Sequence, residues 1–335
     1  MNVSPLVSIC IPVYNGADFI SNCLQCCISQ SYKNIEIIVC DDCSTDNTAA
    51  VIKEFSSQDS RIKYFKNEQN LGLVKNWNTT VNYANGAYIK WLFQDDTMEL
   101  NAIEQFVEAA KKGYKFIISK RNFVLKGNFT PEQINYYNKG VRKLEDFFSA
   151  SDKEHYFTAD EITGYACENI ALNFIGEPSL TFINKESIIK TGLYDEKLHQ
   201  ICDLEYHLRL AIREGVFVIN KPLCGFSIHS QSTTNANINK KYFRLRYFEQ
   251  AFYAYKLLCH EHFLPLQLKI NRLNRFKLKF YIKYRLYEAT KFYQKNKNPE
   301  YHELLSEFPE LKKYTNASVF SNVIFRLIDL AKGRT

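Results

Sequence analysis

The sequence predicts an α/β protein in which a doubly wound, mostly parallel sheet is flanked by helices and followed by a C-terminal helical extension. Residues 7–13 (VSICIPV) and 35–40 (IEIIVC) are short apolar runs rich in β-branched side chains, typical of parallel strands buried on both faces. The segment between them places Phe19, Cys23, Cys26 and Cys27 on one face of a helix. The chain therefore begins with the βαβ pattern of an open sheet.

The same alternation continues along the chain. The next elements expected are a helix capped by Asp46, a strand at 62–65, a helix over 73–86 that Gly86 ends, a strand at 87–93, a helix near 99–111 and a strand near 116–119. Apolar segments resume near 179–184, and two further helices and a strand follow. We therefore assign residues 1–235 to the sheet-containing domain, with 126–165 as an inserted lid or helical excursion, and 236–335 to a basic, aromatic helical extension.

Composition and charge limit the class of protein. The chain has 335 residues, 46% of them hydrophobic, which is enough for a substantial core and excludes full disorder. The net charge of +7 is unevenly distributed, because residues from Lys240 onward carry 20 Lys and Arg but only 8 Asp and Glu. The start of the chain lacks the basic region of a secretory signal, and no stretch has the length of a transmembrane helix. The ten cysteines show no metal-ligand spacing, so we expect a reducing cytoplasm.

Two pairs of adjacent carboxylates follow predicted strands. Asp41 and Asp42 end the second strand, and Asp95 and Asp96 follow the strand at 87–93. Ligands of open α/β sheets bind at the carboxyl ends of the strands, although a single pair could also cap the helix that follows it. Adjacent carboxylates repel each other unless a cation compensates, so Asp95 and Asp96 together predict a divalent ion.

The turn after the first strand has a single glycine, Gly16, and matches neither the dinucleotide-binding nor the P-loop pattern. A diphosphate bound here would have to be neutralised by a metal ion instead of a backbone nest. This combination favours nucleotide-sugar chemistry over dehydrogenase chemistry.

At this point the sequence resembles the family-two glycosyltransferases of the GT-A fold, in particular those of bacterial surface polysaccharides. The resemblance extends from about Pro5 to Ser230. It is carried by PLVSICIPVYNG, IEIIVCDDCSTDNT, NLG, NGAY, QDD, GEPSLTFINKESIIKTGLYDEKL, CDLEYHLRLA and GFSIH, in that order. It implies an inverting transfer of a sugar from a nucleotide diphosphate donor, with a UDP-sugar favoured, to a saccharide acceptor.

The resemblance also assigns the sugar-donor side of the site. Pro12, Tyr14 and Asp42 would frame the nucleotide base, with Asp42 accepting a hydrogen bond from a ring N–H. Asp95 would lie near the ribose, and Asp96 would ligate Mn²⁺ or Mg²⁺ bridging the diphosphate, where the metal acts as a Lewis acid.

On the acceptor side, Asp203 matches the general base, with a helix N-cap as the alternative. His229 matches a histidine near the metal, with a structural histidine as the alternative. This chain has Cys202 where the family commonly has Glu, and Glu205 could replace that carboxylate. The turn beside the donor sugar and the acceptor would contain Gly176, Glu177, Pro178 and Ser179.

Two other functions compete with sugar transfer. A nucleotidyltransferase would need a basic, glycine-rich loop after the first strand, which this sequence lacks. A non-catalytic relative that only binds sugar nucleotides, or serves as a scaffold, would be favoured by loss of Asp96 or Asp203, but both are present.

The extension interleaves Lys and Arg with aromatic and aliphatic residues, as in NRLNRFKLKFYIKYRLYEATKFY. Such a stretch suits either an anionic membrane surface or a helical cap with a solvated basic face. We expect a cytoplasmic protein, peripheral on the inner face of the membrane, with a lipid-linked saccharide acceptor for capsule or lipopolysaccharide synthesis. No nucleic-acid recognition motif accompanies the basic residues, so we expect no nucleic-acid partner.

Overall fold

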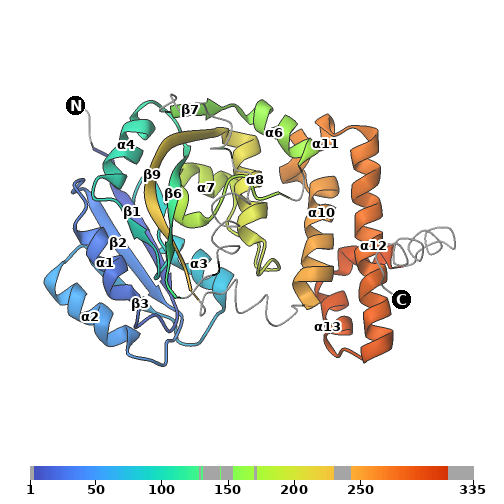
Figure 1. Cartoon of the computed structure of the whole chain (residues 1–335), viewed down its shortest axis with the longest axis horizontal. Helices are drawn as coiled ribbons and strands as arrows, with labels where there is room; N and C mark the ends of the chain where they lie inside the picture. Colours follow the sequence, from blue (N-terminus) through green and yellow to red (C-terminus); the bar gives the residue numbers. More distant parts are fainter. Residues whose placement is uncertain are drawn as a thin grey trace. The chain divides into compact units, whose positions relative to one another are not determined.

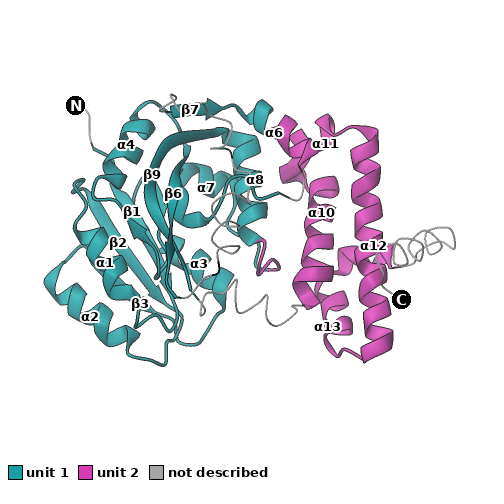
Figure 2. Ribbon diagram, in the orientation of Figure 1, with its two compact units in different colours: residues 1–162, 171–196, 202–232 teal, residues 163–170, 197–201, 233–335 magenta. Residues whose placement is uncertain are grey.

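A computed structural model describes residues 4–127, 130, 144, 154–169, 172–229 and 243–315. The chain divides into two compact units, shown in Figure 2: unit 1 comprises 1–162, 171–196 and 202–232, and unit 2 comprises 163–170, 197–201 and 233–335. Most of the predicted insertion at 126–165 lies outside the described residues. Its described part contains β7 (Glu154–Phe157) and the start of α6 (Ala159–Glu168).

A mixed sheet forms the centre of unit 1 (Figure 1). Within the described residues its strand order is β3-β2-β1-β4-β8-β6-β9-β5, and β7 pairs with β9. The strands are β1 (Val7–Val13), β2 (Ile35–Asp41), β3 (Ile62–Lys66), β4 (Tyr88–Trp91), β5 (Thr97–Met98), β6 (Phe116–Leu125), β8 (Thr181–Asn184) and β9 (Val216–Ile228).

The first half of this sheet is parallel, as the sequence predicts. β1 pairs in parallel with both β2 and β4, and β2 pairs in parallel with β3. Every residue of β1 and β2 is buried, because helices cover both faces and no position has to be polar for solvent. The α/β class is therefore confirmed.

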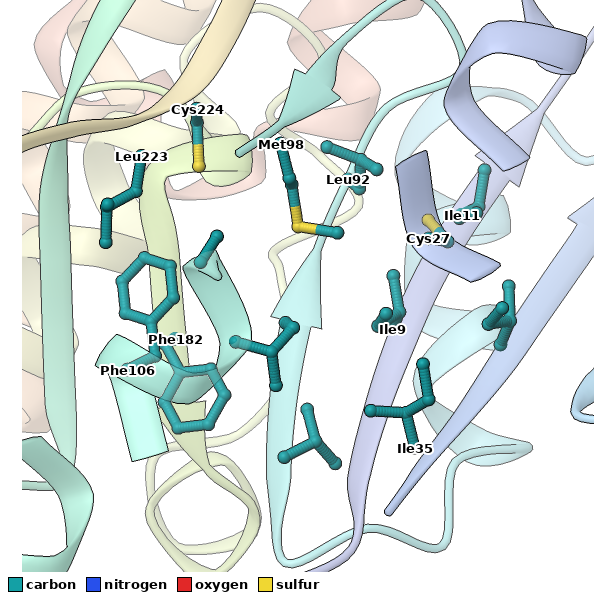
Figure 3. Close-up of a cluster of buried hydrophobic side chains, with 14 of the residues drawn as sticks. Ile9, Ile11, Cys27, Ile35, Leu92, Met98, Phe106, Phe182, Leu223 and Cys224 are labelled. Atoms are coloured by element: carbon teal, nitrogen blue, oxygen red, sulfur yellow. The ribbon is translucent and has the colours of Figure 1, made fainter. Parts of the chain in front are cut away.

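Helices cover the two faces of the sheet. Side chains of Val7, Ile9 and Ile11 point to one face and share a core cluster with α1, α2 and α4, part of which Figure 3 shows around Phe106 and Phe182. The helices of unit 1 are α1 (Ile20–Ile28), α2 (Thr48–Gln58), α3 (Leu73–Asn82), α4 (Ala102–Lys111), α7 (Lys185–Thr191) and α8 (Cys202–Glu214).

The second half of the sheet contains antiparallel pairs that the sequence did not predict. β8 lies between β4 and β6 and is antiparallel to both. The short turn η2 (Pro178–Leu180) leads directly into β8, so the pairing with β4 brings this turn beside the end of β4. The antiparallel insertion thus helps to build the site.

Unit 2 is helical in its described part. Its elements from residue 243 onward are η3 (Arg244–Glu249), α10 (Gln250–Cys259), η4 (Glu261–Phe263), α11 (Leu264–Lys269), α12 (Arg272–Asn296), α13 (Glu300–Glu307) and η5 (Pro309–Tyr314). Aromatic side chains such as Phe248, Phe263 and Phe308 form its interior. No helix in the described residues is both long enough and apolar enough to span a bilayer.

All ten cysteines lie in the described part of the chain and have free thiols. Most are buried small residues within the two units, whereas Cys259 at the end of α10 is exposed.

Candidate functional site

Acidic residues and one histidine gather where strands of unit 1 end. Asp41 is the last residue of β2, Asp95 and Asp96 lie shortly after β4, and His229 directly follows β9. Because β1, β2 and β4 are parallel neighbours, their carboxyl ends lie along one edge of the sheet. The end of β9 reaches the same place, since His229 contacts Asp95.

The carboxylate of Asp96 is directed into the protein and is almost fully buried. Its Oδ1 accepts a hydrogen bond from the backbone N–H of Ser227 at 2.9 Å, and its Oδ2 accepts one from the hydroxyl of Ser179 at 2.5 Å. Burial, and then the adjacent charge of Asp95, raises the pKa of Asp96 to about 7. These two hydrogen bonds occupy part of the acceptor capacity of the Asp96 carboxylate, and its role as a metal ligand stays a prediction.

Asp95 has the more open side chain of the pair. Its Oδ2 lies 2.8 Å from Nε2 of His229. The ammonium group of Lys126 donates to the backbone carbonyl of Asp95 at 3.2 Å, and the hydroxyl of Ser227 donates to the same oxygen. The ring of Phe19 packs against His229, with centroids 4.5 Å apart. Asp95, His229 and Lys126 therefore lie together at the sheet edge.

A fully buried lysine lies beneath this group. Lys90 on β4 donates hydrogen bonds to the backbone carbonyls of Trp91, at 2.9 Å, and of Ser179. Its positive charge partly offsets the rise in the pKa of Asp96. Lys90 thus joins β4 to the turn that donates to Asp96.

The aspartates at the end of β2 hold neighbouring loops. Asp41 accepts hydrogen bonds from the backbone N–H of Ser44 and from the hydroxyl of Tyr64, both at 2.8 Å. Asp42 accepts from the backbone N–H groups of Leu71 and Gly72, at 2.7 and 2.9 Å.

Asp42 also accepts from the side-chain amide of Asn67 at 2.9 Å. Oδ1 receives two of these three bonds and Oδ2 receives one. An ionised carboxylate has about four acceptor sites, so Oδ2 of Asp42 can accept one more hydrogen bond.

Pro12 and Tyr14 lie at the end of β1, beside β2. Pro12 is opposite Cys40 in the parallel register, and the side chain of Tyr14 is 46% exposed. The backbone of Tyr14 is held by the side chain of Gln94, which accepts from its N–H at 2.9 Å and donates to its carbonyl at 3.3 Å. An exposed aromatic ring on a fixed backbone suits stacking against a planar base.

Asp203 lies in the first turn of α8 and is partly buried. Its Oδ1 accepts from the backbone N–H of Leu204 at 2.7 Å, and its Oδ2 accepts from the side-chain amide of Asn173 at 3.1 Å. Burial raises its pKa to about 6, which brings the carboxyl group close to the range in which a general base works at neutral pH.

One segment contacts both the Asp203 carboxylate and the Asp96 carboxylate. Asn173 donates to Asp203, and six residues later Ser179 donates to Asp96. Two carboxylates that are 107 positions apart in the sequence are thus held by residues 173–179.

The middle of this segment is anchored to the rest of unit 1. The carbonyl of Gly176 accepts from Nδ1 of the buried His207 at 3.0 Å, and burial lowers the pKa of His207 to about 4, so this ring is neutral. Gly176 has φ +106°, which favours glycine. Glu177 pairs with the buried guanidinium of Arg121, and Pro178 is buried at the start of η2.

The predicted substitute for the missing family carboxylate has a different role. Glu205 is fully buried and forms an ion pair with Arg209, whose Nε and Nη2 both lie 3.0 Å from its carboxylate. Arg209 also donates to the carbonyls of Thr191 and Leu193. Glu205 therefore fixes the loop before α8, and Cys202 is buried without a carboxylate replacing it.

Several residues at the site were not predicted from the sequence. Asn173, Ser227, Lys126 and Gln94 all contact predicted site residues. The sequence contains a weak indication of Ser227, which lies near the predicted His229, and of Lys126, which lies near the end of an apolar strand. No sequence pattern indicated a site role for the side chains of Asn173 and Gln94, since polar residues near loops are common.

The side chains of Asp95 and His229 could supply some of the ligands of a divalent cation. Among the described residues, no group of three or more His, Cys, Asp and Glu side chains is arranged to hold a metal ion. The Oδ2 of Asp95 and the Nε2 of His229, 2.8 Å apart, are nevertheless an oxygen and a nitrogen that Mn²⁺ accepts. Water and diphosphate oxygens would have to complete such a site.

The fold and the acidic edge of the sheet define an open α/β protein with a candidate ligand site where its strands end. The model of glycosyl transferase family 2 matches residues 8–164. These residues belong to that family, as the resemblance in the sequence predicted.

Curated relatives cover different shares of the chain. The glycosyltransferase GlyA of Streptococcus pneumoniae is 36% identical over 129 residues, which are 38% of this chain and 17% of GlyA. WfgD of Escherichia coli, named as a UDP-Glc:α-D-GlcNAc-diphosphoundecaprenol β-1,3-glucosyltransferase, is 29% identical over 243 residues, which are 71% of this chain and 81% of WfgD. The chain thus spans only a small part of the first of these relatives.

Solved structures share the fold. TarS of S. aureus in complex with UDP-GlcNAc has a TM-score of 0.60 at 14% identity, covering 93% of this chain and 81% of the other. The mannosyltransferase PcManGT from Pyrobaculum calidifontis, in complex with GDP-Man and Mn²⁺, has a TM-score of 0.55 at 15% identity, covering 98% and 87%. At these identities the likeness establishes the fold alone, and it confirms the expected GT-A architecture.

Proposed function

We propose that the chain is an inverting, metal-dependent glycosyltransferase that moves a sugar from a nucleotide diphosphate donor to a saccharide acceptor. The observation that carries this proposal is the segment 173–179, which contacts Asp203 near one end and Asp96 at the other. It supports placing a candidate base and the acidic edge of the sheet in one site. Membership of residues 8–164 in glycosyl transferase family 2 supports the reaction class.

On the sugar-donor side, the nucleotide base would stack on Tyr14 beside Pro12, and its ring N–H would donate to Oδ2 of Asp42. Asp95 and His229 would hold Mn²⁺ or Mg²⁺, in place of the predicted Asp96, because their side-chain atoms lie 2.8 Å apart and Asp95 is more exposed than Asp96, which is almost fully buried. When bound, the metal would neutralise charge on the diphosphate as the nucleotide leaves.

On the acceptor side, Asp203 would act as general base. It would accept the proton of the acceptor hydroxyl while the hydroxyl oxygen attacks the anomeric carbon. The bond from that carbon to the diphosphate oxygen breaks on the opposite face, so the configuration inverts and the nucleoside diphosphate takes the electron pair. Asn173 would orient the carboxylate through its hydrogen bond of 3.1 Å.

For the acceptor, we propose a lipid-linked saccharide of capsule or lipopolysaccharide synthesis. The name of WfgD describes a diphosphoundecaprenol-linked acceptor, and this relative covers 71% of the chain. Among the candidate sugar donors we favour a UDP-sugar, because TarS, which shares the fold, has a structure in complex with UDP-GlcNAc.

A panel of nucleotide sugars tests the proposal. The full chain should hydrolyse one of them slowly in the presence of Mn²⁺ and much more slowly with a chelator, with the anomeric configuration of the released sugar inverted. Binding of nucleotide sugars without hydrolysis or transfer, under conditions that support a known family member, would favour the non-catalytic alternative.

A further inference from the structure

Most aromatic and aliphatic side chains of the basic extension are buried inside unit 2, but a group at the junction of α11 and α12 is not. Leu264, Leu268, Leu273 and Phe276 are 52, 80, 61 and 63% exposed. Leu264 and Leu268 are one turn apart on α11, and Leu273 and Phe276 are neighbours on one face of α12. We call these four residues the α11–α12 patch.

The two helices are held together, so the patch is one surface. The guanidinium of Arg275 on α12 donates to the backbone carbonyl of Gln267 on α11. Asn271 caps α12 by accepting from the backbone N–H of Asn274 at 2.8 Å, and the side chain of Asn274 donates to the carbonyl of Cys167 at 3.0 Å. The turn between α11 and α12 is thus fixed at both ends.

The stretch of sequence that contains the patch carries charges of one sign. Between Glu261 and Glu288 the sequence has seven Lys and Arg and no Asp or Glu. Arg275 donates to a carbonyl and Arg285 to Glu288. Exposed cations next to the patch include Lys269, Arg272, Lys277 and Lys279.

From this arrangement we propose that the α11–α12 patch docks on the surface of an anionic lipid bilayer. The four apolar side chains would enter the boundary between headgroups and acyl chains, and the adjacent cations would contact anionic headgroups. Docking of a second copy through the same face is disfavoured, because it would bring like charges together. A nucleic acid would match the charge but would leave the leucines in water.

This inference goes beyond the proposed sugar transfer, because it concerns where the enzyme meets its acceptor and not how the sugar moves. It also narrows the sequence prediction, in which the whole basic extension was a candidate for membrane contact. In the part of that extension that the structure describes, a packed helical interior is distinct from the exposed α11–α12 patch.

Co-sedimentation of the full chain with vesicles tests the docking. Binding to vesicles of phosphatidylcholine with phosphatidylglycerol is expected at low salt, with much weaker binding to phosphatidylcholine alone. Leu268→Ser, Leu273→Ser and Phe276→Ser combined should reduce binding at any salt concentration. Arg272→Gln, Lys277→Gln and Lys279→Gln combined should reduce it about a hundredfold at low salt, since each cation near an anionic surface contributes about fivefold.

A matched control uses Leu100→Ser with Ile189→Ser, two apolar residues of unit 1 that are 62 and 72% exposed. This variant should bind vesicles like the unchanged protein. The proposal would be overturned if the control lost as much binding as the patch variants, or if the unchanged protein bound neutral vesicles equally well. It would also be overturned if both patch variants bound like the unchanged protein, and docking would then be assigned to another part of the chain. The assay needs neither sugar donor nor acceptor, so its failure and that of the proposed transfer are separate results.

Discussion

The end of β2 and the end of β4 each present two adjacent aspartates at the same edge of the sheet, yet their side chains are used differently. At β2, Asp41 and Asp42 together accept three backbone N–H groups and two side-chain donors from neighbouring segments. At β4, Asp96 accepts a backbone N–H and a hydroxyl, while the side chain of Asp95 lies 2.8 Å from Nε2 of His229.

The difference shows that the exposure of a carboxylate, more than residue type, separates one that holds the fold from one that can bind a ligand. A carboxylate that is buried among its hydrogen-bond partners loses those bonds when it turns to reach a ligand. By this criterion Asp41, Asp42 and Asp96, which are at most 2% exposed, hold the fold, whereas the partly exposed Asp95 and Asp203 are the candidates for chemistry. Asp42 keeps one acceptor site for a ligand. The following predictions test this division.

The largest effect is expected at Asp203. Asp203→Asn should lower turnover by about two to four powers of ten, the usual contribution of a general base, and leave binding of the nucleotide sugar unchanged. Steady-state kinetics and calorimetry measure the two quantities. Turnover equal to that of the unchanged enzyme would exclude Asp203 as the base.

The next effect separates the two members of the β4 pair. Asp95→Asn should remove the Mn²⁺-dependent part of nucleoside diphosphate binding and lower turnover by about two to three powers of ten. Asp96→Asn should retain Mn²⁺-dependent binding, because an amide can keep a hydrogen bond to Ser227. Calorimetry with Mn²⁺ and with a chelator compares the variants, and the reverse outcome would restore Asp96 as the ligand.

A smaller effect on stability should separate the two pairs. Asp42→Ala leaves the part-buried N–H groups of Leu71 and Gly72 without their acceptor, which should lower the free energy of unfolding by about 1–3 kcal/mol. Asp95→Ala removes a partly exposed contact with His229 and should lower the free energy of unfolding by less than about 1 kcal/mol. Urea denaturation of both variants decides whether the β2 pair is the structural one.

The smallest effect is a change with pH. Because the pKa of Asp203 is raised to about 6, the base is protonated below that pH, and turnover should fall about tenfold per pH unit there and level off above it. Asp203→Asn should lose this slope. The folded pKa lies above the ordinary 3.8, so the stability that Asp203 contributes falls as pH rises from about 4 to 6, and the Asn variant should not be destabilised at pH 7.

Local sequence patterns predicted the parallel half of the fold well. The run at 7–13 became β1 with the same bounds, and the run at 35–40 became β2 with one residue added, because continuous β-branched segments have few alternatives. The antiparallel position of β8 between β4 and β6 could not be predicted, since it depends on pairing between residues about 90 positions apart.

The sequence predicted which residues belong to the candidate site, but not how their side chains are arranged. Adjacent Asp95 and Asp96 look equivalent in the sequence, and what distinguishes them is a hydroxyl 83 positions away and an N–H 131 positions away from Asp96. The ion pair of Glu205 with Arg209 could have been predicted from the sequence, because a spacing of four residues on a helix favours such a pair. The roles assigned to Pro12, Tyr14 and Asp42 stay predictions.

The free thiols of this chain have a practical consequence. Cys259 is exposed at the end of α10, whereas Cys10, Cys23 and Cys27 are among those shielded in the interior of unit 1. A thiol-reactive fluorophore should therefore attach first at Cys259 in the native protein, without prior removal of the other cysteines. The same exposure makes Cys259 the expected point of covalent cross-linking between molecules when the protein is stored without a reducing agent.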